Sequence, residues 1–516
     1  MHLNEQYMLY KIAYQLVESE KYEILHIDTN INEIWLELYQ NKKSKVIRLI
    51  HKGFDWQNHL RKDIAIVFQK AKNMKKLLRG KEIEIYNIYV SSYPPVDDWE
   101  ALKRPMQLKE KNPVKMNVYY LDEENYKSEL TRLIDTLDVN KITQDDSYFS
   151  DEELEVERKR YKEKLVLTVE EKRKEIHNVF SFGKPFFTFA IIILNIIMFI
   201  LLEINGGSMV IDTLIDYGAK YNPAIIENNE WWRIISSMFL HIGFLHLLMN
   251  MLAVYYLGTA VEKIYGKWRF IFIYSLAGIG GGLASFAFSA NVSAGASGAI
   301  FGLFGALLFF GIIHKRIFFQ TMGLNILVVL GINIAFGFTL EQIDMAAHIG
   351  GLVAGFIASA IIHLPNKKKI VMQFVAMLVY VVMVAGLIYF GTYNNLNNQT
   401  YYLMEIESLI EEEQFETVVE VATEALETGG DREGLLLFQR SYAYIELDMI
   451  ERAIDDLENS ITYEAIPESY HNLSLLYFNQ GNIEAARENI RKAYRMDSTN
   501  ESFKELYEEI IGEPGP

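Results

Sequence analysis

The stretch Ser293-Ala-Gly-Ala-Ser297-Gly-Ala-Ile-Phe301-Gly runs directly into an apolar segment that continues to residue 313. A serine between small residues at the start of such a segment is either a helix cap or a nucleophile. Two other clusters of polar residues help to decide between these two roles. His348 lies inside a second apolar segment, and His246 and Asn250 are one helical turn apart on the same face of a third. Polar groups inside membrane spans usually face the bundle interior and mark function, so three such clusters predict a site.

The composition indicates a membrane part flanked by soluble parts. Of 516 residues, 50% are hydrophobic and 23% are charged, and the mean hydropathy is +0.05. The net charge of −17, without a long basic block, argues against nucleic-acid binding. The absence of cysteine excludes disulfides, cysteine catalysis and thiolate metal sites. Charges recur throughout the first 40 residues, so we expect no cleavable signal peptide and insertion through internal segments.

Residues 1–140 are predicted to form a soluble α/β domain. Alternating apolar residues predict strands near 33–39, 45–51, 83–90 and 114–121, and helical spacing predicts a helix over 56–78. His26, His51 and His59 could meet as a metal site, although scattered surface or core histidines are the more common explanation. Because this domain shows no phosphate loop, metal-ligand spacing or catalytic pair, we expect a regulator or a docking surface.

Seven apolar segments predict a polytopic α-helical membrane protein, which follows a charged helical linker over 141–180. Residues 185–204 supply about 20 apolar positions, enough for a helix to cross a ~30 Å hydrocarbon layer. Several later segments are rich in glycine, as expected where helices pack backbone to backbone. The six further candidates lie near 236–258, 268–288, 297–313, 323–338, 344–363 and 370–391, the last being a seventh transmembrane helix within 366–393.

Basic residues set the expected orientation in the membrane. The loop over 205–232 is acidic, whereas alternate later loops carry Lys263, Lys267, Arg269, Lys315, Arg316, Lys367, Lys368 and Lys369. By the positive-inside rule, the N-terminus is cytosolic and the C-terminus is extracytoplasmic. This topology places Asn250, Ser297 and His348 at a similar shallow depth below the outer face.

These residue types suit acyl transfer by a serine–histidine dyad. His348 can take the Ser297 hydroxyl proton as general base and return it to the leaving amine. Donors for the oxyanion are the side chains of His246 and Asn250 and the backbone N–H of Ser297. Asp344 stands at a helix N-cap position. The small-xxx-small pair of Gly351 and Gly355 would let the two helices of the dyad approach closely.

These motifs closely resemble those of the rhomboid intramembrane serine proteases. The resemblance covers about residues 180–365 and rests on Gly295-Ala-Ser297-Gly298, Ala347-His348-Ile-Gly-Gly351-x-x-x-Gly355, His246-x-x-x-Asn250 and Trp232-Arg233. It implies a six-helix catalytic core over 181–365, with Ser297 and His348 as the dyad and His246 and Asn250 in the oxyanion hole. It also implies that the Trp232-Arg233 segment forms a loop lying sideways in the outer leaflet.

Three further positions bear on this resemblance. Glu230 and Glu262 match family positions that brace this loop and the second span. Many members carry tyrosine where this chain has Phe301, whose ring can still stack on His348 but lacks the hydroxyl. Ala296 and an intact dyad favour activity, because inactive relatives often lose the serine or histidine or place proline before the serine.

Residues 394–516 are predicted to form an all-α repeat domain. Tyr470-x-Asn-Leu-x-x-x-Tyr477-x-x-x-Gly481 resembles a tetratricopeptide repeat. A second copy precedes it, because matching residues recur 33 positions apart, as in Tyr444 and Tyr477. A degenerate third copy holds Phe415, Ala422 and Ala425. Such helix pairs stack into a short solenoid with a concave surface that binds protein partners.

Three alternative interpretations compete with an active protease. Either motif alone is explained by a serine cap and a core histidine, but all motifs at a matched depth make this explanation weak. A rhomboid-like pseudoprotease would bind membrane helices or act in quality control without cutting, and the intact dyad weighs against it. A transporter also has glycine-rich spans and midplane polar groups, but the internal repeat expected of one is not apparent.

The sequence therefore predicts an intramembrane serine endopeptidase that cuts transmembrane proteins near the outer face of the membrane. Its partners would be transmembrane substrates, the lipid bilayer and proteins bound by the repeats, with no nucleic acid. No metal or organic cofactor is called for. A bacterial plasma membrane is the expected location.

Overall fold

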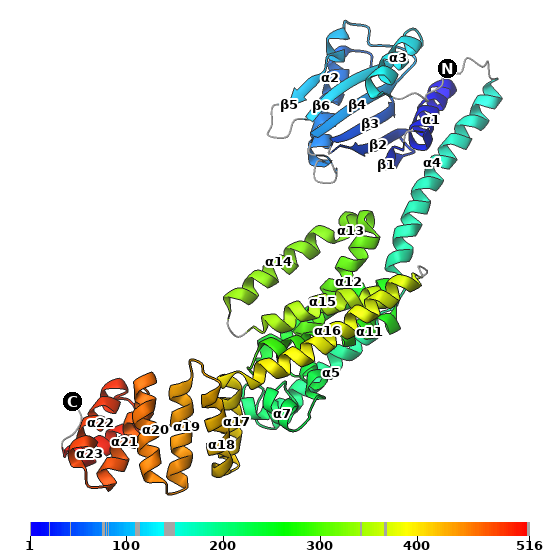
Figure 1. Cartoon of the computed structure of the whole chain (residues 1–516). Helices are drawn as coiled ribbons and strands as arrows, with labels where there is room; N and C mark the ends of the chain where they lie inside the picture. Colours follow the sequence, from blue (N-terminus) through cyan, green and yellow to red (C-terminus); the bar gives the residue numbers. More distant parts are fainter. Residues whose placement is uncertain are drawn as a thin grey trace. The chain divides into compact units, whose positions relative to one another are not determined.

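The computed structural model describes residues 2–19, 21–41, 43–74, 78, 80, 82–108, 114–138, 150–340, 343–365 and 369–512. The chain divides into two compact units, Met1–His177 and Asn178–Pro516 (Figure 1). The start of the predicted linker, residues 141–149, lies outside the described residues, as do Lys367 and Lys368.

The first unit contains a mixed sheet in the order β1-β2-β3-β4-β6-β5. Its strands are β1 (Glu23–Asp28), β2 (Glu33–Gln40), β3 (Lys43–His51), β4 (Glu82–Val90), β5 (Met106–Leu108) and β6 (Val114–Leu121). The central pairs β3–β4 and β4–β6 are parallel, whereas the outer pairs are antiparallel. The helices are α1 (His2–Ser19), α2 (Gln57–Met74) and α3 (Tyr126–Leu137), with a short 3₁₀ turn η1 (Glu100–Lys103). The expected α/β class is therefore observed, and α1, α3, β1 and β5 add to the predicted elements.

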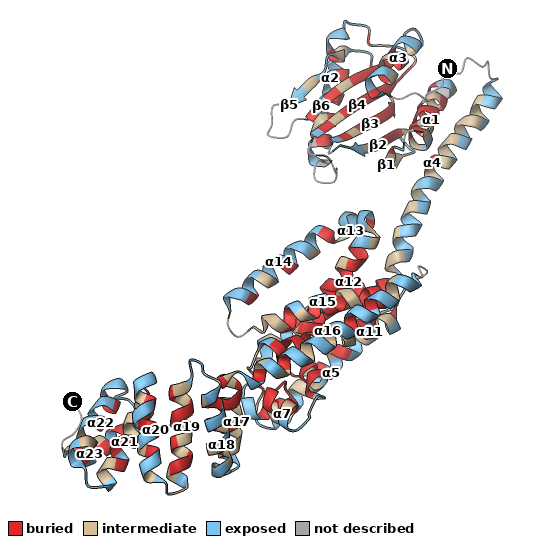
Figure 2. Cartoon of the chain, viewed as in Figure 1, coloured by how far each residue is buried: buried red, intermediate tan, exposed pale blue. Residues whose placement is uncertain are grey.

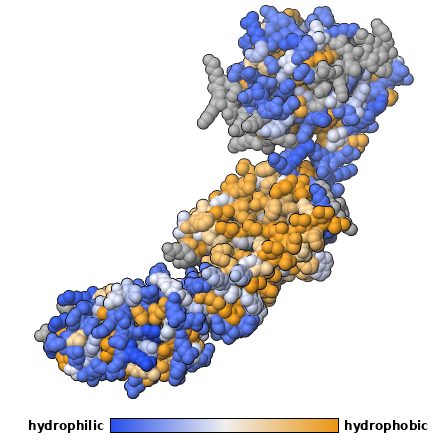
Figure 3. All heavy atoms as spheres, in the orientation of Figure 1, coloured by the Kyte–Doolittle hydropathy of each residue, from blue (hydrophilic) through white to orange (hydrophobic). Residues whose placement is uncertain are grey.

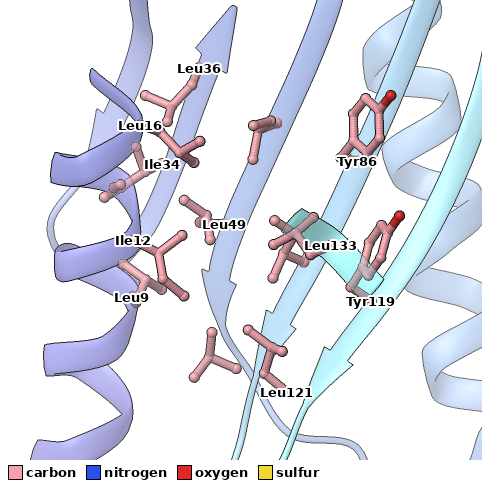
Figure 4. Close-up of a cluster of buried hydrophobic side chains, with 14 of the residues drawn as sticks. Leu9, Ile12, Leu16, Ile34, Leu36, Leu49, Tyr86, Tyr119, Leu121 and Leu133 are labelled. Atoms are coloured by element: carbon pink, nitrogen blue, oxygen red, sulfur yellow. The ribbon is translucent and has the colours of Figure 1, made fainter. Parts of the chain in front are cut away.

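Helices cover both faces of this sheet. One core contains apolar side chains of α1 and α3, and the other contains those of α2. Figure 4 shows the apolar side chains of α1 facing the sheet, where the labelled residues include Leu9, Ile12, Leu16, Ile34, Leu36 and Leu49. The β-branched and aromatic residues of the central strands are buried on both faces, as expected for a sheet with parallel strands at its centre.

The charged linker forms a single long helix, α4 (Asp151–Phe180). It packs along α1, where the rings of Tyr14 and Tyr161 lie 5.1 Å apart. Arg158 Nη1 also donates to Gln6 Oε1 at 2.8 Å, and Leu165 is 1% exposed. The mixed charges of α4 are mostly solvent-exposed, as the charge pattern predicted.

The second unit begins with a bundle of apolar helices. They are α5 (Phe187–Ile204), α9 (Gly243–Ala253), the π-helical turn η3 (Val254–Gly258), α10 (Thr259–Tyr265), α11 (Lys267–Phe288), α12 (Ser297–Ile313), α13 (Lys315–Thr321), α14 (Gly323–Thr339), α15 (Met345–Ile362) and α16 (Ile370–Leu396). Short helices α6 (Ile211–Asp216), α7 (Asn222–Glu227), α8 (Arg233–Ser236) and η2 (Ser237–Phe239) lie between α5 and α9. Figure 3 shows apolar residues covering the surface of this bundle, as expected where lipid is the solvent.

Five of these described helical segments are long and apolar enough to cross a membrane, or six if the bent pair α13–α14 counts as one span. The bend of that pair is 75°, and α12 is a shorter apolar helix of 17 residues. The predicted start of the second span near 236 is wrong. The long helix begins at Gly243, where φ is +74°, and continues through η3 to Tyr265.

The C-terminal part of the second unit consists of antiparallel helix pairs, as predicted. The helices are α17 (Gln399–Glu411), α18 (Phe415–Glu427), α19 (Glu433–Glu446), α20 (Ile450–Tyr463), α21 (Pro467–Asn479), α22 (Ile483–Met496) and α23 (Glu501–Ile511). Figure 2 shows buried positions alternating with exposed ones along these helices, for example along α19. Small residues are among the buried ones on α18, α20 and α22. They include Ala422, Ala425, Ala453, Ala486 and Ala493.

Candidate active site

Glycines bring α12 and α15 into backbone contact. A Cβ atom added at Gly355 or Gly351 would collide with backbone atoms of Gly302 or Gly298 on α12. A Cβ at Gly298 would lie 3.3 Å from the carbonyl oxygen of Ala347. The immediate sequence neighbours of Ser297 and His348 therefore touch. The close approach expected from Gly351 and Gly355 is confirmed.

His348 lies one turn into α15, and its ring packs against α12. Its neighbour Asp344 is the N-cap of α15, where Oδ1 accepts the Ala347 N–H at 2.9 Å and Oδ2 accepts the Ser285 hydroxyl. The Phe301 ring stacks on His348 with 4.1 Å between the ring centroids and 14° between the planes. Both the cap and the stack are thus as predicted. Since Ser297 lies one helical turn before Phe301, it projects from the same side of α12.

The backbone before Ser297 is held by several contacts. Gly295 has φ +151°, and its N–H donates to the Ser237 carbonyl at 2.9 Å. The Ala296 N–H points to His241 Nε2 at 3.5 Å. A Cβ on Gly295 would come within 2.9 Å of His246 Cε1, so a larger residue would press on that imidazole. This contact gives a steric reason for glycine before the serine.

The two candidate oxyanion donors occupy one face of α9. The His246 ring lies beside the Gly295 backbone, 5.2 Å from the His241 ring. Asn250 is 6% exposed, and its Nδ2 donates to the carbonyl of His246 at 3.1 Å, within its own helix. The structure therefore places the His246 imidazole next to the serine loop, residues 289–296 between α11 and α12, while the Asn250 amide satisfies a local carbonyl.

The loop before α9 is braced by an ion pair. Arg233 is 7% exposed and binds Glu230 at 2.5 Å, and its Nη1 donates to the Ile215 carbonyl at 2.6 Å. Trp232 is 50% exposed, and the Arg233 guanidinium lies over its ring at 4.9 Å. The guanidinium therefore fixes the path of this segment, as expected for Glu230 and Arg233.

Glu262 caps the first apolar helix. Its carboxylate accepts the backbone N–H groups of Phe186, Phe187 and Thr188 at 2.9 to 3.0 Å, and the Thr188 hydroxyl at 2.7 Å. It is fully buried on α10. A carboxylate beside the unpaired N–H groups of a helix start is stabilising, so Glu262 fastens α5 to the helix that follows η3.

Several residues at this site had no predicted role. His241 contacts the serine loop, and its spacing of five residues from His246 was an available signal. Lys220 and Asn222 bind the other end of that loop, and Asn395 joins them from α16. Only the isolation of Lys220 in an acidic stretch was visible in the sequence.

The described part of the chain contains no group of three or more histidine and carboxylate side chains placed to hold a metal ion. His51 instead pairs with Glu5, with 2.6 Å between Nε2 and Oε2. The described residues therefore give no support to a metal site at His26, His51 and His59.

Comparison with known proteins identifies the family. The rhomboid domain matches residues 228–365, and a tetratricopeptide repeat matches residues 467–500. Rhomboid protease GluP of Bacillus subtilis (strain 168) is 35% identical over 474 residues, which cover 92% of both chains. The chain belongs to the rhomboid family.

Other relatives match a shorter part of this rhomboid. Putative rhomboid protease YdcA of Bacillus subtilis is 34% identical over 179 residues, covering 34% of this rhomboid and 87% of the relative. RHOMBOID-like protein 6, mitochondrial, of Arabidopsis thaliana is 40% identical over 147 residues, covering 28% and 48% of the two chains. The names of the bacterial relatives support intramembrane protease activity, and the apolar helices indicate that this rhomboid is a membrane protein.

Proposed function

We propose that this rhomboid is a serine endopeptidase that cuts transmembrane proteins near the outer face of the membrane. Ser297 is the nucleophile and His348 the general base. The observation that carries the proposal is the stack of Phe301 on His348 at 4.1 Å, on helices whose glycines touch beside both residues. This packing supports an imidazole held in one orientation beside the serine at the start of α12.

The proposed chemistry is acyl transfer in two halves. The Ser297 oxygen attacks the substrate carbonyl while His348 accepts its proton, and His348 then protonates the departing amine. Water repeats these steps on the acyl-enzyme. The His246 side chain and the Ser297 backbone N–H stabilise the oxyanion, and Asn250 joins them when its amide turns from the His246 carbonyl.

The proposed substrate is a transmembrane segment that unwinds near the outer face. A regular helix engages its carbonyls in its own hydrogen bonds, so a local break must expose the scissile bond. The rhomboid resemblance implies small residues such as alanine just before the cut. Placement of the site near the outer face rests on the basic loops, which put the N-terminus in the cytosol and the C-terminus outside a bacterial plasma membrane.

The two flanking domains are proposed to recruit proteins to the protease or to control its activity. The repeat family at residues 467–500 supports binding of protein partners. The N-terminal domain over 1–140 is proposed as a cytosolic docking surface or regulator. The domain limits at 141–180, 181–365, 366–393 and 394–516 follow from the sequence pattern.

Cleavage of a model transmembrane substrate by the detergent-purified full chain tests this function. We expect Ser297→Ala and His348→Ala to abolish cleavage, while Ser275→Ala on α11 cleaves like the parent. Product ends should map near the outer boundary of the substrate helix. Unchanged cleavage in either dyad variant would overturn the assignment. A folded parent that cuts none of several substrates would favour a pseudoprotease that binds membrane helices.

A further inference from the structure

The C-terminal end of α11 is capped by side chains from distant parts of the chain. The last carbonyls of a helix have no partner within it. Here Lys220 Nζ donates to the Ser289 carbonyl at 2.8 Å, and Asn222 Nδ2 donates to the same oxygen at 3.1 Å. Asn395 Nδ2 on α16 donates to the Phe286 carbonyl at 2.9 Å. This cap, defined by Lys220, Asn222 and Asn395, fixes the point where the serine loop leaves α11.

Lys220 is an unusual residue to find in such a place. It is 1% exposed, and a buried ammonium group is destabilising unless it is compensated. Burial lowers the pKa of Lys220 to about 8, while the charge of Asp344 acts in the opposite direction. The negative end of the α11 dipole also favours a cation at this position. The proposed protease mechanism gives this lysine no task.

Lys220 also holds the serine loop through its backbone. Its N–H donates to the Ser293 carbonyl at 2.9 Å, and the Ser293 N–H donates to the Lys220 carbonyl at 3.0 Å. One residue therefore holds the loop both at Ser289, through its side chain, and at Ser293, through its backbone. Ser293 lies four positions before Ser297, and the intervening Gly295 is bound to Ser237.

We propose that Lys220 is a positioning residue, whose bond to Ser289 sets the path of the loop that carries Ser297. This inference rests on the proposed protease function. Lys220 is buried and its ammonium group is bound to Ser289, eight positions before Ser297, so its effect on the reaction must pass through the geometry of the loop. A displacement of about 1 Å at a reacting group can lower a rate about 100-fold.

The same cap connects the loop to the C-terminal part of the chain. Asn222 Nδ2 lies 2.7 Å from Asn395 Oδ1, near the end of α16. The next residue after Lys220 is also engaged, because the Tyr221 hydroxyl donates to the Met404 carbonyl on α17 at 2.8 Å. The short segment 220–222 therefore contacts the serine loop, the seventh apolar helix and the first repeat helix.

Lys220→Met tests the proposal, because it keeps the aliphatic stem and removes the donor. Lys267→Met is the matched control, an exposed lysine at the opposite end of α11. Three measurements on the full chain are needed: amide hydrogen exchange over 289–297, labelling of Ser297 by a fluorophosphonate probe, and cleavage kinetics of the model substrate.

We expect Lys220→Met to speed exchange over 289–297 while exchange elsewhere stays unchanged. Probe labelling and kcat should fall roughly 10- to 100-fold, with KM within about twofold, because positioning affects the reaction more than binding. Lys267→Met should match the parent in all three measurements. If Lys220→Met does not fold, Asn222→Ala removes the second donor to Ser289 and should show the same pattern at smaller size.

Two results would overturn the proposal. Unchanged exchange over 289–297 would show that the side chain does not hold the loop. Faster exchange with unchanged labelling and kcat would show that the bond does not position Ser297. Failure of the protease function itself looks different. The parent would then neither label nor cleave, and the exchange measurement would still decide whether Lys220 holds the loop.

Discussion

In both the membrane bundle and the repeat domain, helices pack against each other at small residues, but these residues make different kinds of contact. In the bundle, glycines at 298, 302, 351 and 355 bring backbone against backbone. In the repeats, alanines such as Ala453 and Ala486 are fully buried among larger side chains. The repeat domain over 394–516 also carries 27 acidic and 8 basic residues, whereas the outer surface of the bundle is apolar.

The difference follows from the solvent of each region. Lipid is as apolar as leucine, so helices in a membrane gain little from burying apolar area and associate by close packing and hydrogen bonds. In water, burial of apolar surface contributes about 25 cal/mol per Å². A larger side chain at a glycine contact should therefore disrupt the packing of the bundle. A larger side chain at an alanine contact should remove only part of the stability of the repeats.

The largest effect is expected from Gly355→Leu. A Cβ at this position would collide with the backbone of Gly302, so the variant must separate α15 from α12. We expect complete loss of substrate cleavage, although Gly355 lies two helical turns from His348. The measurement is cleavage by purified protein, with size-exclusion chromatography to report whether it is folded.

Gly386→Leu is the matched control for this prediction. It places the same side chain on α16, where the structure shows no heavy atom within 4 Å of an added Cβ. It should cleave like the parent. Full cleavage by Gly355→Leu would show that the backbone contact is not needed to align the two helices.

A smaller effect is expected from Ala453→Leu in the repeats. Ala453 is 0% exposed and packs in a cluster with Tyr444 and Leu457. Overpacking of this kind costs about 1–3 kcal/mol, so the melting temperature of the repeat domain should fall. Cleavage of a substrate that needs no recruitment should persist. Ala465→Leu, at an exposed position after α20, should change neither property.

Local patterns in the sequence were sufficient to predict much of the site. The N-cap at Asp344 was predictable from its place four residues before His348. The stack of Phe301 on His348 was predictable from the family resemblance, and both features are observed. The strands near 83–90 and 114–121 were predictable because the alternation of apolar and polar residues along a segment indicates which of its side chains are buried.

Contacts between distant segments outside the family motifs were not predictable. Asn222 and Asn395 are 173 positions apart, and nothing in either local pattern indicates that they share a hydrogen bond. The start of the second span was placed too early, because apolar residues continue back to Met238 while Gly243 at φ +74° ends the preceding turn. In the sequence, Lys220 was notable only as a lysine in an acidic stretch, because its role depends on where α11 ends.

Ion pairs offer another comparison of the two regions. Glu230 and Arg233, 2.5 Å apart, are mostly buried beside the bundle, whereas Glu488 and Lys492, 2.7 Å apart, are exposed on the repeats. Glu230→Gln weakens a charge-assisted bond and should lower stability by about 1 kcal/mol, after allowance for its partial exposure. Glu488→Gln should have no measurable effect. Thermal melting of both variants checks this, and equal shifts would contradict it.

The smallest effect is expected where the two regions meet. Glu405 on α17 is partly buried near Glu227 of α7 and Glu424 of α18, and burial together with these two charges raises its pKa to about 7. The nearby hydroxyl of Tyr401 donates to Glu227 Oε1 at 2.7 Å. Three carboxylates therefore share one junction between the repeat domain and the loop before α9.

The sign of the pH dependence follows from this raised pKa. Between the ordinary value of 4.5 and about 7, the folded state binds a proton that the unfolded state releases. The stability from this proton is fully present below pH 4.5 and is lost as the pH rises through 7. Glu405→Gln should therefore raise the melting temperature by roughly 1–2 °C at pH 8 and change it little at pH 5. Glu407→Gln, exposed on the same helix, is the control, and an equal shift at both pH values would show that ionisation of Glu405 is not the cause.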